Sequence, residues 1–82
     1  MRHALQVQRI TRQGNHEGFM VRFDSNYGKC TTFIHPWQQN LLHRGENLLY
    51  VNVIRRFKEM AHIRLPDGSH VHVPSTLVRE VM

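Results

Sequence analysis

Residues 62–73 read HIRLPDGSHVHV, and the triplet at the centre of this stretch decides the fold. Pro66 presets the backbone angle of the second residue of a type I turn, Asp67 suits the third, and Gly68 tolerates a positive φ. This order predicts a three-residue hairpin loop closed by a glycine bulge. The loop fixes the pairing of its two arms: Leu65 with Ser69, Arg64 with His70, Ile63 with Val71, His62 with His72 and Ala61 with Val73.

The predicted register separates the hairpin into an apolar and a polar side, because cross-strand partners share a face. The apolar side carries Ala61, Ile63, Leu65, Val71 and Val73. The polar side carries His62, Arg64, His70 and His72. A slip of one residue, or a two-residue loop at the Asp-Gly pair, would mix the two sides. The alternation therefore predicts a solvent-facing patch of three histidines and one arginine.

A further strand is predicted just before this hairpin, in the stretch LLYVNVI at residues 48–54. If a short loop at Arg56–Lys58 joins the two, the alternation continues on both faces. The apolar pairs are then Val53 with Ala61, Val51 with Ile63 and Leu49 with Leu65. The polar pairs are Tyr50 with Arg64 and Asn52 with His62. The expected polar face consists of Tyr50, Asn52, His62, Arg64, His70 and His72.

Helical spacing within residues 52–66 leaves an alternative open. The apolar positions that recur at this spacing are Val53, Phe57, Met60 and Ala61. Asn52 would be the N-cap of such a helix, and Pro66 would end it. The turn signal and the clean separation of the two faces favour strands over this helix.

The first 35 residues are dominated by alternation of apolar and polar side chains, which predicts strands. In HALQVQRIT the alternation runs through Leu5 and Val7 and then slips by one place to Ile10, so we expect a bulge near Gln8–Arg9. The compositions of QGNHEG and DSNYGK predict turns on either side of FMVRF. The short stretch CTTFIH is β-branched and predicts a strand that stops at the following proline.

One short helix is expected near residues 36–44, within PWQQNLLHRG. Pro36 suits a first helical position, and Gly45 suits the position just past the end. Trp37 and Leu41 are four residues apart and would share the buried face. We therefore expect Trp37 in the core rather than exposed as a stacking residue.

The closing segment GSHVHVPSTLVREV resembles the end of SH3-like barrels, in which a strand runs into a proline, a 3₁₀ turn follows, and a short strand carries a valine. The matching residues are Val73, Pro74, Ser75 and Val78. Ser75 would cap the helical turn, and Leu77, Val78 and Val81 would close the core. The acidic loop and the aromatic peptide-binding positions of signalling SH3 domains are not evident, so proline-rich peptide binding is not implied.

The order of elements is also similar to an OB-fold, whose helix follows the third strand. Together these patterns predict a mainly β chain that forms a small, strongly bent β-barrel, SH3-like or OB-like. We expect five to six antiparallel strands with one short helix near residues 36–44. A chain of 82 residues is expected to form a single domain over residues 1–82.

The charge balance favours a polyanionic partner. Lys and Arg number 11 against 6 Asp and Glu, which gives a net charge of +5 with neutral histidines. Most of these cations are arginines, whose planar fork suits phosphate. Cys30 is the one cysteine and is expected to be a small buried residue rather than a nucleophile. A single cysteine and the lack of a long apolar run predict a cytoplasmic protein.

Three groups of residues are candidate sites. The polar face mixes a stackable ring, a cation and neutral donors, as single-stranded nucleic-acid platforms do. The cations of the loop after residue 54, Arg55, Arg56 and Lys58, would hold phosphates beside this polar face. Arg9, Arg12 and Arg22 of the first hairpin would help them. The predicted nucleic-acid-binding residues are Tyr50, Arg64, His62, His70, His72, Arg55, Arg56 and Lys58. The three imidazoles could also converge on Zn²⁺, but no carboxylate or cysteine accompanies them and Arg64 opposes a dication, so no metal site is expected.

Enzyme motifs are not evident: the sequence has no nucleophile elbow, phosphate-binding glycine loop, H-E-x-x-H or zinc-finger spacing. The main hypothesis is a non-catalytic module without a cofactor that binds RNA or DNA. The alternative is a protein-interaction module, an inhibitor or adaptor that binds an acidic partner surface. A thin core and free sheet edges also suggest a homo-oligomer.

Overall fold

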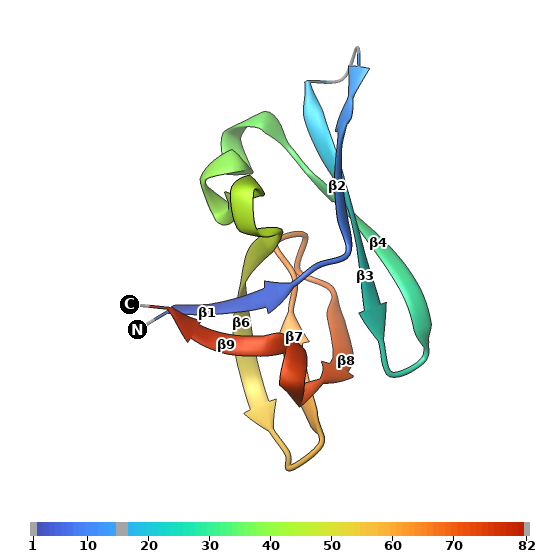
Figure 1. Cartoon of the computed structure of the whole chain (residues 1–82), viewed down its shortest axis with the longest axis vertical. Helices are drawn as coiled ribbons and strands as arrows, with labels where there is room; N and C mark the ends of the chain where they lie inside the picture. The colour runs from blue at the N-terminus through green and yellow to red at the C-terminus, as the bar shows by residue number, and fades with distance from the viewer. Residues whose placement is uncertain (1, 15–16, 82) are drawn as a thin grey trace.

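The structure is a computed structural model that describes residues 2–14 and 17–81, and it is built mainly from antiparallel strands (Figure 1). The predicted mainly β class is confirmed. Within the described residues the strands are β1 (Arg2–Gln6), β2 (Arg9–Gln13), β3 (Gly18–Ser25), β4 (Gly28–Ile34), β5 (Leu42–His43), β6 (Leu48–Arg56), β7 (Met60–Arg64), β8 (His70–Pro74) and β9 (Val78–Val81). The same residues contain the 3₁₀ helices η2 (Pro36–Leu41), η3 (Arg44–Glu46) and η4 (Ser75–Leu77).

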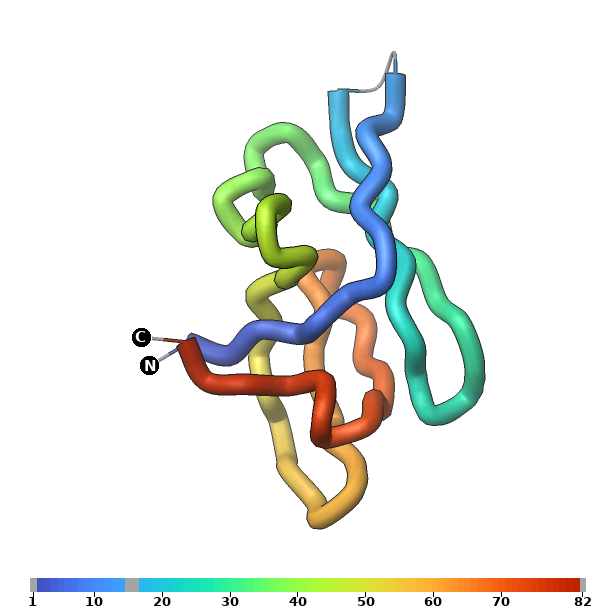
Figure 2. Tube along the Cα trace, in the orientation of Figure 1, coloured from blue at the N-terminus to red at the C-terminus, as the bar shows by residue number. Residues whose placement is uncertain are grey.

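These strands form two sheets, and Figure 2 shows the chain passing from β1 of the larger sheet into β2 of the smaller one. The larger sheet has the order β8-β7-β6-β1-β9, and β5 also pairs with β6. The smaller sheet has the order β2-β3-β4. The sheets are not closed into a barrel, and the described residues contain more strands than the five to six expected. The number rises because the first alternating stretch divides into β1 and β2, the segment expected to be helical contributes β5, and the C-terminal segment ends in β9.

The bend between β1 and β2 explains the slip in the first alternating stretch. A bulge within one strand was expected near Gln8–Arg9, but β1 ends at Gln6 and β2 begins in the other sheet. The backbone N–H of Val7 donates to Asn47 O at 2.9 Å, and that of Gln8 donates to Arg22 O at 2.8 Å. The change of phase therefore marks the transfer of the chain from one sheet to the other.

The hairpin of β7 and β8 has the predicted register, with all four predicted pairs from Ala61–Val73 to Arg64–His70 present. Gly68 has a φ of 90°, and its N–H donates to Leu65 O at 2.9 Å. Leu65 N–H in turn donates to Ser69 O at 2.8 Å, which closes the predicted three-residue loop. Asp67 Oδ1 accepts bonds from Ser69 N at 2.8 Å and Ser69 Oγ at 2.6 Å. These bonds lower the pKa of the Asp67 carboxyl.

The segment before this hairpin is a strand, so the helical alternative for residues 52–66 is wrong, but the predicted register of β6 is also wrong. Asn52 pairs with Arg64 rather than His62, and the register shifts between Val53 and Arg55. The connection is a tight turn whose Phe57 N–H donates to Met60 O at 2.8 Å, not a loop at Arg56–Lys58. Before the bulge, the observed register of β6 against β7 differs from the predicted register by two residues. Because the side-chain period of a strand is two, Asn52 stays on the polar face.

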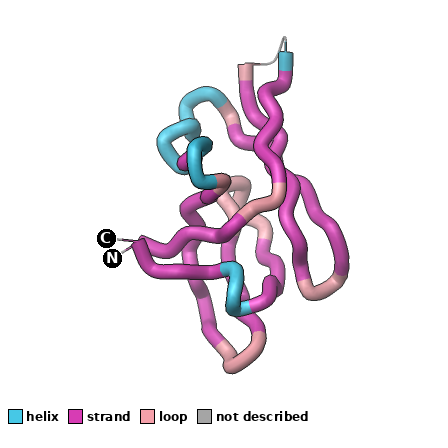
Figure 3. The backbone as a smooth tube through the Cα atoms, in the orientation of Figure 1, coloured by secondary structure: helices cyan, strands magenta, loops and turns pink. Residues whose placement is uncertain are grey.

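The expected helix near residues 36–44 is also wrong. Its first part is η2, and the chain then extends into β5, where Leu42 pairs with Leu49 of β6 (Figure 3). The backbone of Leu42 and His43 pairs with β6 instead of continuing the helix, so the helix ends early. Asn47 rather than Gly45 takes the left-handed conformation, with a φ of 54°. Trp37 is 75% exposed, which contradicts its expected place in the core.

One apolar core joins the inner faces of both sheets. Its largest fully buried side chains are Phe23, Leu5, Ile34, Leu49, Ile63, Val21 and Val73. The alternation predicted for FMVRF is confirmed, since Phe19, Val21 and Phe23 are all buried. The C-terminal segment closes this core with Val78, as expected. Ser75 does not cap η4; its hydroxyl donates instead to the Lys58 carbonyl at 3.0 Å.

Candidate nucleic-acid interface

The outer surface of the larger sheet carries most of the polar residues that the alternation singled out. We call it the β6–β8 face and define it by Tyr50, Asn52, Arg55, His62, Arg64, His70 and His72. Its members point away from the core because their strand neighbours Val53, Ile63 and Val73 pack inward. The two predicted polar pairs of β7 and β8, His62 with His72 and Arg64 with His70, both lie on this face.

The histidines of this face form a row of rings. The centroids of His70 and His62 lie 4.9 Å apart, and those of His62 and His72 lie 4.8 Å apart. His62 Nε2 and His70 Nδ1 lie 2.9 Å apart and share a hydrogen bond. Tyr27 extends the row, edge-on to His72 at 6.1 Å. We call His70, His62, His72 and Tyr27 the ring row.

Tyr27 was not predicted as a site residue, although it is 79% exposed. It lies in the β3–β4 turn, whose Asn26 N–H donates to His72 O at 2.9 Å. The Tyr27 hydroxyl lies 3.4 Å from His72 Nδ1. The turn itself was predicted, but local sequence carries no signal that it meets β8, so the contact is visible only in the folded chain.

Crowding of the imidazoles favours the neutral form of the central ring. Burial lowers the pKa of His62, and the positive charges of His70 and His72 lower it further. A neutral imidazole offers one donor and one acceptor and a flat apolar face. The centre of the ring row is therefore suited to stacking and neutral hydrogen bonding at ordinary pH.

Tyr50 occupies a different environment from the one expected. It is half-buried, and the Arg2 guanidinium lies 3.8 Å from the centroid of its ring. Arg2 and Tyr50 line a depression of about 320 Å³ together with Asn52 and Arg64. Arg2, which was not predicted, thus places a cation on the ring that was expected to receive a base.

The predicted loop cations are divided among three environments. The bulge turns Arg55 onto the β6–β8 face, opposite His62. Arg56 Nη2 instead donates to Ser75 O at 3.1 Å and Val78 O at 2.9 Å, so it ties β6 to the C-terminal segment. Lys58 lies in the exposed β6–β7 turn. Of the three, Arg55 is therefore the one that lies on the β6–β8 face beside the ring row.

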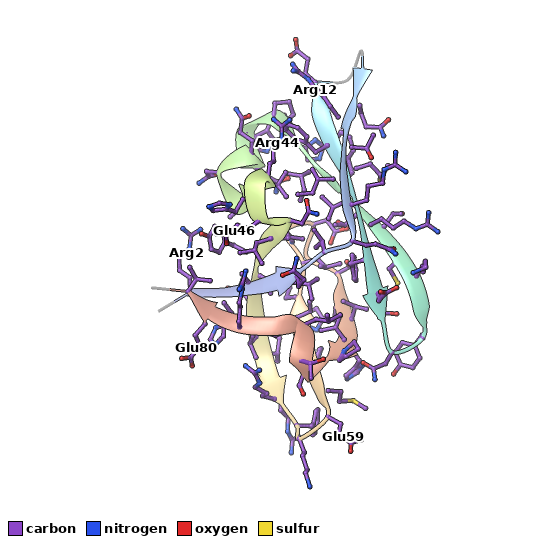
Figure 4. All side chains as sticks on the ribbon, viewed as in Figure 1. Arg2, Arg12, Arg44, Glu46, Glu59 and Glu80 are labelled. Atoms are coloured by element: carbon purple, nitrogen blue, oxygen red, sulfur yellow. The ribbon has the colours of Figure 1, made fainter. Side chains whose placement is uncertain are left out.

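The cations of the first hairpin do not flank this face. Arg9 and Arg22 pair with each other in the smaller sheet, and Arg12 pairs with Phe19 near η3. Figure 4 shows Arg12 and Arg44 together at the end of the molecule opposite Glu59. The Arg44 guanidinium lies 4.8 Å from the Phe19 ring centroid. These cations therefore belong to the smaller sheet, whereas Arg55 and Arg56 belong to the larger one.

No carboxylate belongs to the β6–β8 face. Glu46 and Glu80 line a separate depression beside Tyr50, where Glu46 lies 3.5 Å from Arg79. Asp67 follows the face in the hairpin loop, where its Oδ1 is bonded to Ser69. Arg55 and Arg64 of this face have no carboxylate partner among the ion pairs of the described residues.

Three further features of residues 2–14 and 17–81 concern other kinds of site. This part of the chain contains no group of three His, Cys, Asp or Glu side chains arranged to hold a metal ion. Cys30 is half-buried, and its thiol lies 3.4 Å from Ser25 Oγ. No helix in the described part of the chain has the length and apolar character needed to span a membrane.

Comparison with known proteins finds no family model that matches the chain, and no significant match among curated proteins or solved structures.

Proposed function

We propose that this chain is a non-catalytic nucleic-acid-binding module that uses the β6–β8 face. The observation that carries the proposal is the ring row beside Arg55 and Arg64, which have no carboxylate partner among the ion pairs of the described residues. Proteins that bind single strands combine cations that hold phosphates with flat side chains that stack on bases. The same chemistry serves RNA and DNA.

Each part of the face has a role in this proposal. Arg55 and Arg64 neighbour the ring row and hold phosphates, which gives affinity without sequence information. The rings of the ring row receive bases and bond to their edges. Arg2 lies over Tyr50 and adds a third cation at the far side of the face.

The proposal also includes a finer description of the fold: the two sheets are the halves of a strongly bent, SH3-like barrel that is not fully closed. Hydrogen bonds join the sheets at Val7–Asn47, Gln8–Arg22 and Asn26–His72. The order β8, η4, β9 supports the same description, with Val78 buried after the 3₁₀ turn. Function rests on the site rather than on this fold.

Fluorescence anisotropy of labelled oligothymidylate and oligouridylate of about 12 nucleotides tests the function. Each arginine that contacts phosphate on a single strand contributes about 0.7 to the slope of log K against log salt. Replacing both Arg55 and Arg64 by Gln should therefore lower that slope by about 1.4. Arg12→Gln removes an exposed charge outside the face and should leave the slope near the wild-type value. Absence of binding at about 50 mM salt would remove the proposal.

A protein-interaction module is the second candidate, and one observation favours it. Ile54 and Phe57 are 49% and 41% exposed beside the β6–β7 turn, and the Arg55 guanidinium lies 5.0 Å from the Phe57 ring centroid. Exposed apolar side chains next to arginine are common at protein interfaces. A partner that co-purifies after nuclease treatment, and is lost in the Ile54→Ser/Phe57→Ser variant, would support this function instead.

A further inference from the structure

The outer face of the smaller sheet carries an exposed aromatic stack. Trp37 is 75% exposed and lies parallel to His35, with an interplanar angle of 4° and 4.4 Å between the ring centroids. The His35 ring meets the half-buried Phe33 edge-on at 5.0 Å. We call Phe33, His35 and Trp37 the aromatic stack. Since burial of a tryptophan is strongly favourable, its exposure here calls for a partner.

The segment that presents the stack is held from both sides. Pro36 begins η2, and Gln38 Oε1 accepts a bond from the His35 backbone N–H at 3.1 Å. Gln38 Nε2 donates to Pro66 O at 3.4 Å, which links η2 to the β7–β8 loop. Trp37 is therefore displayed on an anchored turn.

The base of the stack is fixed by Gly18. A Cβ at this position would lie 2.3 Å from Phe33 Cζ and 2.7 Å from the carbonyl oxygen of Ile34. Only glycine leaves the Phe33 ring room to lie over the neighbouring strand at this distance. The stack is thus built on the sheet rather than on a loop alone.

Two unneutralised arginines share this face. Arg9 of β2 lies directly opposite Arg22 of β3, although like charges at such positions are destabilising. Among the ion pairs of the described residues, neither has a carboxylate partner. Met20 lies two residues from Arg22 on the same side and pairs with Phe33, so both arginines face outward with the aromatic stack.

We propose that the outer face of β2–β4 is a second nucleic-acid contact surface, specific for single strands, on which Trp37 stacks on an unpaired base. Arg9 and Arg22 hold the adjacent phosphates, and the bound anion relieves their mutual repulsion. One side of the indole lies against His35, and the other is open to a base. This inference rests on the proposed function and narrows its ligand to unpaired strands, since paired bases do not offer their flat faces.

The experiment uses Trp37 as its own reporter, because it is the one tryptophan in the chain. Oligothymidylate of about 12 nucleotides should quench its fluorescence, and a duplex of equal length should not. Trp37→Ala should weaken binding of the labelled single strand about tenfold, within the range of one lost base stack. The residue is exposed, so the variant should fold, which circular dichroism verifies.

A second variant keeps the test independent of the indole. Arg9→Gln/Arg22→Gln should reduce both affinity and quenching, whereas Arg12→Gln, on the same hairpin but the other face, should change neither. Anisotropy could show binding while Trp37 fluorescence stays unchanged and Trp37→Ala binds as tightly as the wild type. That result would overturn this inference and leave the proposed function unaffected. Equal quenching by the duplex would overturn the preference for single strands. Absence of binding to any oligonucleotide would overturn both proposals.

Discussion

The hairpin loop offers a test whose size follows from geometry alone. Gly68 has a φ of 90°, and a Cβ added there would meet no atom within 4 Å. Alanine at this position therefore creates no clash, and its cost is that of a left-handed backbone, about 1–2 kcal/mol. Loss of freedom in the unfolded chain returns about 0.4–1 kcal/mol. We expect Gly68→Ala to lower the free energy of unfolding by about 1 kcal/mol.

Urea denaturation followed by far-UV circular dichroism measures this change, and the melting temperature should fall by about 4–8 °C. Gly68→Asn should cost less, because asparagine tolerates the left-handed region. Gly45→Ala is the matched control: its Cβ would lie 3.9 Å from His43 Cε1, without a positive φ. The reasoning fails if Gly68→Ala is as stable as the wild type, or if Gly45→Ala is destabilised equally.

Two further predictions concern charge. Because the pKa of His62 is lowered in the folded chain, the unfolded chain binds more protons just below its ordinary pKa; stability should therefore fall as the pH decreases from about 7.5 to about 5.5. In His62→Gln, the free energy of unfolding measured by urea denaturation should fall less over this pH range. A fall equal to that of the wild type would contradict the assignment of the pH dependence to His62. Arg56→Gln should lose about 1 kcal/mol of stability, since it breaks the bonds to the Ser75 and Val78 carbonyls. The same variant should keep the wild-type salt slope for oligonucleotides. A reduced slope, as expected for the Arg55→Gln/Arg64→Gln variant, would show that Arg56 contacts phosphate.

The hairpin of β7 and β8 was predictable because its signals are local. Proline, aspartate and glycine specify the loop, and alternation then fixes the faces. The register of β6 was not predictable in the same way. Its connection turns at Lys58–Glu59 without glycine or proline, and the bulge next to Ile54 has no sequence signal. The residues of β6 were still assigned to the correct faces, because the error in the predicted register before the bulge was an even number of residues.

Residues that depend on contacts between distant segments were missed or misplaced. Tyr27 joins the histidines because a turn of one sheet meets the edge of the other. Arg2 reaches Tyr50 across β1 and β6. Trp37 was expected in a helix that leans on a sheet, but pairing of β5 with β6 shortens that helix and leaves the indole outside. Spacing within a segment carries none of this information.

The most direct measurement of the central claim is a nuclear magnetic resonance titration of the protein with oligothymidylate of about 12 nucleotides. The account predicts that the imidazole signals of His62, His70 and His72 shift together with the backbone amides of β6–β8. Signals of Lys58, in the turn beyond the face, should move little. Binding that leaves all three imidazoles unmoved would contradict the assignment of the β6–β8 face as the nucleic-acid interface.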